Sequence, residues 1–201
     1  MKVNNISLIG CGGCPLGEHG WGYTNKNAME SMVSACLDQG VNFFDTADVY
    51  GMGASEKLIG RALSSKPRDK VFIASKFGVR IDSNSNTTYY DNSKRWFWES
   101  LHNSLKRLRV DYLDLYQLHY WDGRVEINTI LEYLEKAKDE GKIRFGGVTN
   151  LDLTDYTSDL PNFLFSFSQQ YSLFDRKFEE NIEKILNQTS LRFLSWGSLA
   201  Q

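Results

Sequence analysis

The sequence has few features of a membrane, secreted or nucleic-acid-binding protein. No apolar run approaches the roughly 20 residues that a bilayer-spanning helix needs, and residues 1–5 are not followed by the apolar core of a signal peptide. The 3 cysteines are too few and odd in number for a disulfide framework. Neither charge dominates, since 23 Lys plus Arg stand against 25 Asp plus Glu. We therefore expect a cytoplasmic protein whose partners include neither nucleic acid nor membrane.

Strand-like and helix-like segments alternate along the chain, without a linker or low-complexity segment. With 201 residues the chain can bury a sizeable core, and we place one domain over residues 1–201. The expected strands cover residues 6–10, 41–44, 71–74, 113–118, 145–148, 165–169 and 192–196. The expected helices cover about residues 25–39, 55–63, 93–108, 128–140, 153–160 and 178–187. A glycine-rich loop at 10–22 and a long polar loop at 78–92 complete this α/β pattern.

Two features favour a (β/α)8 barrel over an open doubly wound sheet. No G-x-G-x-x-G follows the first strand, because the glycines of residues 10–14 have the wrong spacing. Polar residues also follow or finish successive strands, and these are Asp45, Lys76, His119, Asn150 and Gln169. In a barrel these strand ends converge on one rim, where active sites lie, whereas an open sheet would spread them out.

The segment 41–51 combines a strand with two residues suited to proton transfer. Asp45 ends an apolar run, and Tyr50 follows five residues later on the loop. A carboxylate that can be buried and a phenol that can donate a proton are a reasonable beginning for acid–base chemistry. A strand-end Asp can equally well be the cap of the following helix, so this pair alone does not decide between the two roles.

Two other patterns predict less. Cys11 and Cys14 have C-x-x-C spacing but no second pair, so we expect no metal or redox site. A basic patch surrounds the helix at 93–108 and is interleaved with aromatic residues. Its members are Arg95, Lys106, Arg107 and Arg109. Because the chain as a whole is slightly acidic, we interpret the patch as a solvated helix face rather than a nucleic-acid surface.

With these candidates in view, the chain resembles the aldo-keto reductase family. The matching segments are residues 44–51, 74–78, 111–119, 141–150 and 196–200. They occur in the family's order and cover almost the whole chain. The resemblance implies a TIM (β/α)8 barrel of the aldo-keto reductase type, incomplete at the C-terminus with seven of its eight strands.

The resemblance also implies an activity, the NADPH-dependent reduction of a small aldehyde or ketone, with NADH as the alternative cofactor. Tyr50 would be the general acid that protonates the forming alkoxide. Lys76 would supply a cation that favours the phenolate of Tyr50, and Asp45 would pair with Lys76 and orient it. His119 would direct a ring nitrogen at the substrate oxygen.

Further positions match the family's cofactor contacts. Thr149 and Asn150 would hold the nicotinamide carboxamide, and Trp196 would stack on the nicotinamide ring. The remaining candidates for the cofactor are Gln169, Ser198 and Leu199. The chain departs from the family at Ser168, where a Gln is usual, so that Gln169 lies one place later.

The resemblance leaves other functions open. Some relatives are cofactor-binding regulatory subunits, for example of potassium channels, and keep the same residues. The missing eighth strand and C-terminal loops would select the substrate and grip the adenosine end of the cofactor. We therefore also consider a fragment of a longer protein, an inactive truncated reductase, and either self-association or a partner chain that completes the barrel.

Overall fold

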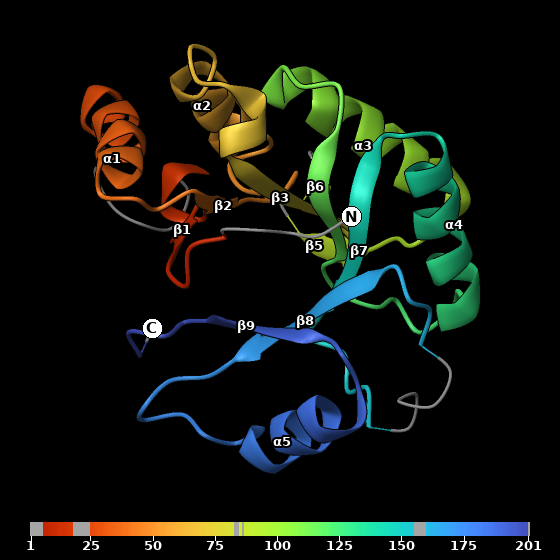
Figure 1. Cartoon of the computed structure of the whole chain (residues 1–201). Coiled ribbons are helices and arrows are strands. Elements are labelled where there is room, and N and C mark those ends of the chain that lie inside the picture. The colour runs from red at the N-terminus through yellow and green to blue at the C-terminus, as the bar shows by residue number, and fades with distance from the viewer. Residues whose placement is uncertain (1–5, 18–24, 83–84, 86, 155–159, 201) are drawn as a thin grey trace.

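A single curled sheet of seven parallel strands organises the chain (Figure 1). The structure is a computed structural model, and it describes residues 6–17, 25–82, 85, 87–154 and 160–200. The sheet order is β1-β2-β3-β6-β7-β8-β9, so the strands of this sheet lie side by side in chain order, and β4 and β5 form a separate sheet. Their bounds are β1 Gly10–Gly12, β2 Phe43–Asp45, β3 Phe72–Phe77, β6 Leu113–Leu118, β7 Ile143–Thr149, β8 Leu164–Gln170 and β9 Arg192–Trp196. The predicted incomplete barrel is confirmed.

Helices connect the strands and cover the outside of the sheet (Figure 1). They are α1 Lys26–Asp38, α2 Ala54–Ala62, α3 Lys94–Leu108, α4 Ile127–Asp139 and α5 Glu179–Gln188, with short 3-10 turns η1 Pro15–Gly17 and η2 Arg68–Lys70. The Asn25 side chain accepts hydrogen bonds from the first turn of α1, and Gly40 follows its end with a φ of 80°, as the capping signals predicted. The helix expected at 153–160 lies mostly outside the described residues. None of the described helices is long and apolar enough to cross a membrane.

The two-residue period of the strands separates the main core from a smaller inner cluster. Phe44 and Ile73 belong to the main core, which lies between the sheet and the helices. The inner cluster of the half-barrel consists of Phe43, Phe72, Ala74 and Leu115. Two residues further along these same strands, on the same face, come Asp45, Lys76 and Gln117. The inner face is therefore apolar towards the start of the strands and polar towards their carboxyl ends.

The first strand was predicted too early in the sequence. The strand lies at Gly10–Gly12 and not at residues 6–10, and the side chains of Leu8 and Ile9 are exposed. Ser7 instead exchanges hydrogen bonds with Asn42, through the Asn42 side chain and its own hydroxyl. Because β2 begins only at Phe43, the chain before Gly10 has no strand to pair with.

The long polar loop predicted at 78–92 contains a β-hairpin. Its strands are β4 Val79–Ile81 and β5 Thr88–Tyr90, which pair antiparallel. The Arg80 guanidinium lies 4.1 Å from the ring of Trp96 and binds Asp91 at 2.8 Å. The prediction relied on polarity, whereas the threonine and tyrosines of β5 favour extended structure and cross-strand contacts.

Candidate active site

A partly buried ion pair joins β2 and β3 at the polar end of the inner face. Lys76 Nζ lies 2.5 Å from Asp45 Oδ2 and donates a second hydrogen bond to the Thr46 carbonyl at 3.0 Å. Lys76 is buried, because β3 continues to Phe77 and carries it inside the strand rather than beyond its end. Burial lowers the pKa of Lys76, but Asp45 and Tyr50 raise it by more, so the net pKa is above the ordinary value. Lys76 is therefore a fixed cation at neutral pH.

Gln117 completes this pair, and the sequence interpretation assigned it no role. It lies opposite Lys76 in the register of β3 and β6, and its Nε2 donates to Asp45 Oδ1 at 3.2 Å. The available signal was an amide in a strand, 113–118, whose only other strongly polar residue is Asp114. Asp45 thus accepts hydrogen bonds on both oxygens, which holds the carboxylate in one orientation.

Tyr50 reaches the pair from the turn that follows β2. The turn requires left-handed backbone at three successive residues, where φ is 58° at Gly51, 51° at Met52 and 85° at Gly53. Lys76 Nζ lies 5.1 Å from the centre of the Tyr50 ring. The His119 ring lies edge-on to the same ring, with a centroid distance of 5.7 Å and an interplanar angle of 84°. Residues from three strand ends therefore meet around one phenol.

Burial keeps the Tyr50 phenol protonated. It raises the pKa of Tyr50, and Asp45 adds to this effect, while Lys76 acts in the opposite direction. The net pKa is raised. Lys76 does favour the phenolate, as expected from the sequence, but burial has the larger effect. A protonated phenol is the form that donates a proton.

His119 is held as a neutral imidazole. Burial, and then the charge of Lys76, lower its pKa well below the ordinary value. Its backbone is fixed by a hydrogen bond from its N–H to the Phe77 carbonyl at 2.8 Å. Among the described residues, its buried Nδ1 has no hydrogen-bond partner. A neutral ring can donate one hydrogen bond, so His119 is suited to orienting an oxygen atom.

Asn150 and Trp196 are joined to His119 by a chain of hydrogen bonds. Asn150 Nδ2 donates to the His119 carbonyl at 3.1 Å, and Asn150 Oδ1 accepts from Trp196 Nε1 at 3.2 Å. Asn150 has a φ of 58°, a left-handed conformation that asparagine tolerates better than most residues. Its neighbour Thr149 has a buried hydroxyl with no partner in the described part of the chain. An unsatisfied buried hydroxyl is costly unless another group meets it.

The other cofactor candidates are placed less centrally. Gln169 on β8 donates from Nε2 to the Leu151 carbonyl at 3.0 Å. Ser198 is exposed, and its hydroxyl lies 3.0 Å from that of Ser195. Leu199 is also exposed. The structure thus brings Asp45, Lys76, Tyr50, His119, Asn150 and Trp196 together, and it leaves Ser198 and Leu199 at the surface.

Within the described residues, no three His, Cys, Asp or Glu side chains are grouped to hold a metal ion. Cys11 is buried on β1 and Cys14 is half-buried beyond it. Both are free thiols.

Asp48, in the turn before Tyr50, should make the stability of the protein depend on pH. Its Oδ2 accepts from Ser100 Oγ at 2.6 Å, and burial is the main cause that raises its pKa to about 7. Because the folded pKa exceeds the unfolded one, this group stabilises the fold at low pH, and that contribution is lost as the pH rises through 7. Between pH 5 and 9 the free energy of unfolding should fall by about 2 to 3 kcal/mol through Asp48.

Asp48→Asn should remove this dependence, because an amide does not ionise. Urea unfolding at pH 5, 7 and 9 measures it, with Asp139→Asn on the exposed face of α4 as the control. An unchanged pH slope in Asp48→Asn would show that Asp48 is not the titrating group.

A half-barrel of βα units with this site at its carboxyl rim defines a class of protein. The sequence profile of the aldo/keto reductase family matches residues 8–201. The chain belongs to the aldo-keto reductase family.

Individual relatives agree with this assignment. The chain is 34% identical over 199 residues to aldo-keto reductase YhdN of Bacillus subtilis (strain 168), covering 97% of this chain and 59% of the relative. The holo structure of aldo-keto reductase AKR11C1 from Bacillus halodurans superposes with a TM-score of 0.85 at 31% identity, covering 97% and 63%. An aldo-keto reductase from Klebsiella pneumoniae in complex with NADPH has a TM-score of 0.80 at 29% identity, covering 97% and 65%. The chain spans about three fifths of the length of these relatives.

Proposed function

We propose that this chain carries the catalytic residues of a cytoplasmic NADPH-dependent reductase of aldehydes or ketones. The observation that carries the proposal is that Lys76 and His119 both lie beside the Tyr50 ring, and that Asp45 binds Lys76. Each residue has the charge state that the reaction needs, namely a protonated phenol, a fixed cation and a neutral imidazole.

The rim residues fit a nicotinamide cofactor. The crystal structure of the Klebsiella pneumoniae relative is a complex with NADPH. In this chain the unpartnered hydroxyl of Thr149 lies next to Asn150, where a bound carboxamide would satisfy it, and the half-exposed Trp196 offers a flat ring. The side-chain nitrogen and oxygen of Asn150 already form hydrogen bonds with His119 and Trp196. Thr149 is therefore the stronger candidate for binding the carboxamide. When bound, the nicotinamide supplies the hydride.

The chain's own residues supply the proton and the orientation. Tyr50 donates its phenol proton to the oxygen of the substrate as negative charge develops there. Lys76 stabilises the phenolate left behind and is itself held by Asp45, so little rearrangement is needed. His119 donates a hydrogen bond to the same oxygen and fixes its direction. Lys76 and His119 are buried, which strengthens these electrostatic effects.

Completing the barrel tests the proposal. β1 and β9 are the two ends of the sheet, and neither pairs with a further strand in the described part of the chain. Adding the C-terminal third of the Bacillus halodurans relative after residue 201 should tighten NADPH binding at least tenfold, because binding energy remote from the reacting atoms positions the nicotinamide. Protein fluorescence titration measures the affinity, and NADPH absorbance with a panel of aldehydes measures turnover.

The 201-residue chain alone is the control. We expect it to bind NADPH weakly and to self-associate through its open edges in size-exclusion chromatography. A monodisperse monomer of the short chain that binds NADPH as tightly as the completed protein would contradict this account. Tight binding by the completed protein without turnover of any carbonyl would instead favour a cofactor-binding regulatory subunit.

A further inference from the structure

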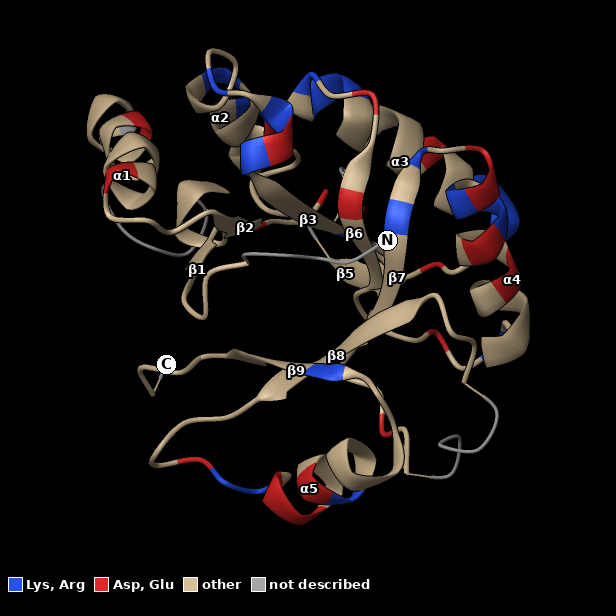
Figure 2. Cartoon of the chain, in the orientation of Figure 1, with Lys and Arg blue, Asp and Glu red and all other residues tan. Residues whose placement is uncertain are grey.

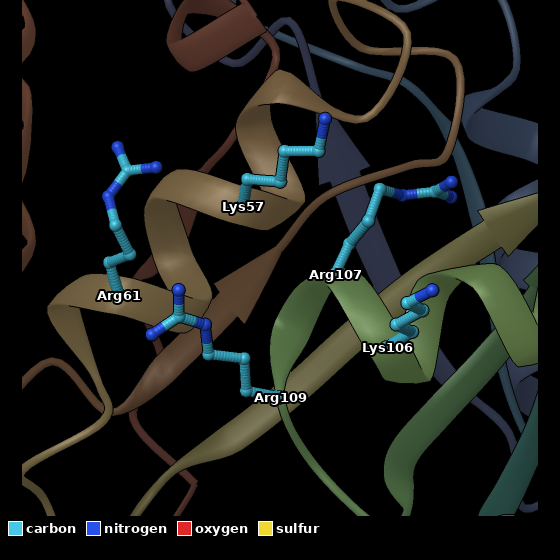
Figure 3. A pocket seen from close by; sticks show the side chains of 5 residues that line it. All are labelled: Lys57, Arg61, Lys106, Arg107 and Arg109. Atoms are coloured by element: carbon cyan, nitrogen blue, oxygen red, sulfur yellow. The ribbon is translucent and has the colours of Figure 1, made fainter.

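A basic hollow lies on the outside of the half-barrel, between α2 and α3. It has a volume of about 270 Å³. The residues lining it are Lys57, Arg61, Lys106, Arg107 and Arg109 (Figure 3). Figure 2 shows the same concentration of positive charge on α2 and the C-terminal end of α3. The chain as a whole has a net charge of -2, so this positive charge is a local feature.

Two of the five cations are held by carboxylates and shape the hollow. Arg107 binds the fully buried Glu56 at 2.5 Å, and Glu56 also accepts a hydrogen bond from Ser75 at 2.6 Å. Arg61 binds Glu30 on α1 at 2.7 Å. A side chain on a buried carboxylate keeps one position, so Arg107 forms a rigid wall of the hollow.

The other three cations are uncompensated. Lys57, Lys106 and Arg109 are exposed, and within the described residues none of them has a carboxylate within 4.0 Å. Arg109 ends α3 in a left-handed conformation with a φ of 59°. Five cations against two carboxylates leave an excess of three positive charges around a space of limited size.

The backbone fixes the spacing of these charges. α2 and α3 approach closely at Gly60, where an added Cβ would lie 2.6 Å from the Leu108 carbonyl oxygen. Lys57 and Arg61 are four residues apart and share one face of α2. The hollow is therefore formed by two helices in direct backbone contact and does not depend on a loop.

We propose that this hollow binds a phosphate-bearing small molecule through a di- or triphosphate group. The guanidinium fork of Arg109 matches phosphate oxygens with paired hydrogen bonds, and Lys57 and Lys106 add point charges. An excess of three positive charges suits a multiply charged anion better than a single carboxylate, and the volume suits a compact group. The hollow is distinct from the site around Tyr50, which lies at the carboxyl ends of the strands on the inner face.

Titration of the barrel-completed protein with inorganic pyrophosphate tests the proposal. In ¹H–¹⁵N correlation spectra we expect saturable shifts at the amides of the hollow, and in calorimetry a one-to-one isotherm. The triple variant Lys57→Gln, Lys106→Gln, Arg109→Gln should weaken the affinity at least fivefold. The matched control is Lys66→Gln, Lys138→Gln, Lys184→Gln, which removes three exposed lysines elsewhere and should leave the affinity within a factor of two.

Three outcomes would overturn the proposal. Equal weakening by both triple variants would mean that only net charge matters. Shifts concentrated at Thr149 and Asn150 would place the anion in the strand-end site instead. Binding of a 20-nucleotide single strand tenfold tighter than pyrophosphate, at equal salt, would assign the surface to nucleic acid. None of these measurements depends on reductase activity.

Discussion

Tyr50→Phe should lower kcat/KM for NADPH-dependent aldehyde reduction by a factor of about 10² to 10⁴, the usual contribution of a general acid. The substitution removes one oxygen atom, and the Tyr50 ring remains in edge-on contact with His119. Binding of NADPH should therefore be almost unchanged. The measurement is steady-state NADPH oxidation by the barrel-completed protein, with affinity determined separately by fluorescence.

The pH profile provides an independent check on Tyr50. Because burial raises its pKa, the phenol should remain protonated at neutral pH, and the rate of reduction should fall only at strongly alkaline pH. As a control, Tyr90→Phe removes the hydroxyl of a tyrosine of the hairpin β4–β5, which stacks on Tyr120 with a centroid distance of 5.1 Å. A loss of less than tenfold in Tyr50→Phe, or an equal loss in Tyr90→Phe, would remove Tyr50 from the role of acid.

Asp45→Asn should have the second large effect, on stability as well as activity. It leaves the buried cation of Lys76 without a counter-charge, and breaking such a pair from one side costs about 3 to 5 kcal/mol. Asp45 is partly exposed, with 29% of its side chain accessible, so we expect the lower end of that range. The free energy of unfolding in urea measures the stability, and kcat/KM should fall at least 10²-fold because Lys76 loses its fixed position.

The double variant Asp45→Asn, Lys76→Met separates the two effects. Removing both charges should restore most of the stability but none of the activity. The pair also has a defined pH dependence. Since the folded pKa of Lys76 is raised, its stabilisation is complete below the unfolded value of 10.5 and is lost as the pH rises through the folded value. If the double variant is as unstable as Asp45→Asn, the ion pair is not the cause of the loss.

Most of the βα pattern could be predicted because each unit has its own local signals. Parallel strands buried on both faces are mostly apolar, and residues 113–118, which are apolar except at Asp114 and Gln117, were predicted with the bounds that the structure has. Helix ends were marked by Asn25, Gly40 and Gly141, whose capping geometry depends on neighbouring residues alone. The edge strand β1 was placed too early and the hairpin β4–β5 was missed, because their pairing depends on partners distant in sequence or on aromatic contacts.

The sequence by itself determined the order of the elements and the residue types at the strand ends, among them Asp45, Lys76 and His119. Only the tertiary structure decided which of these side chains meet, since that depends on the strand register that places Gln117 beside Asp45. The tertiary structure also decided the charge states of Tyr50 and His119. Burial, which no local pattern encodes, outweighs Lys76 in raising the pKa of Tyr50 and keeps His119 neutral. The hollow between α2 and α3 likewise exists because Gly60 lets two helices touch, which brings cations from separate segments around one space.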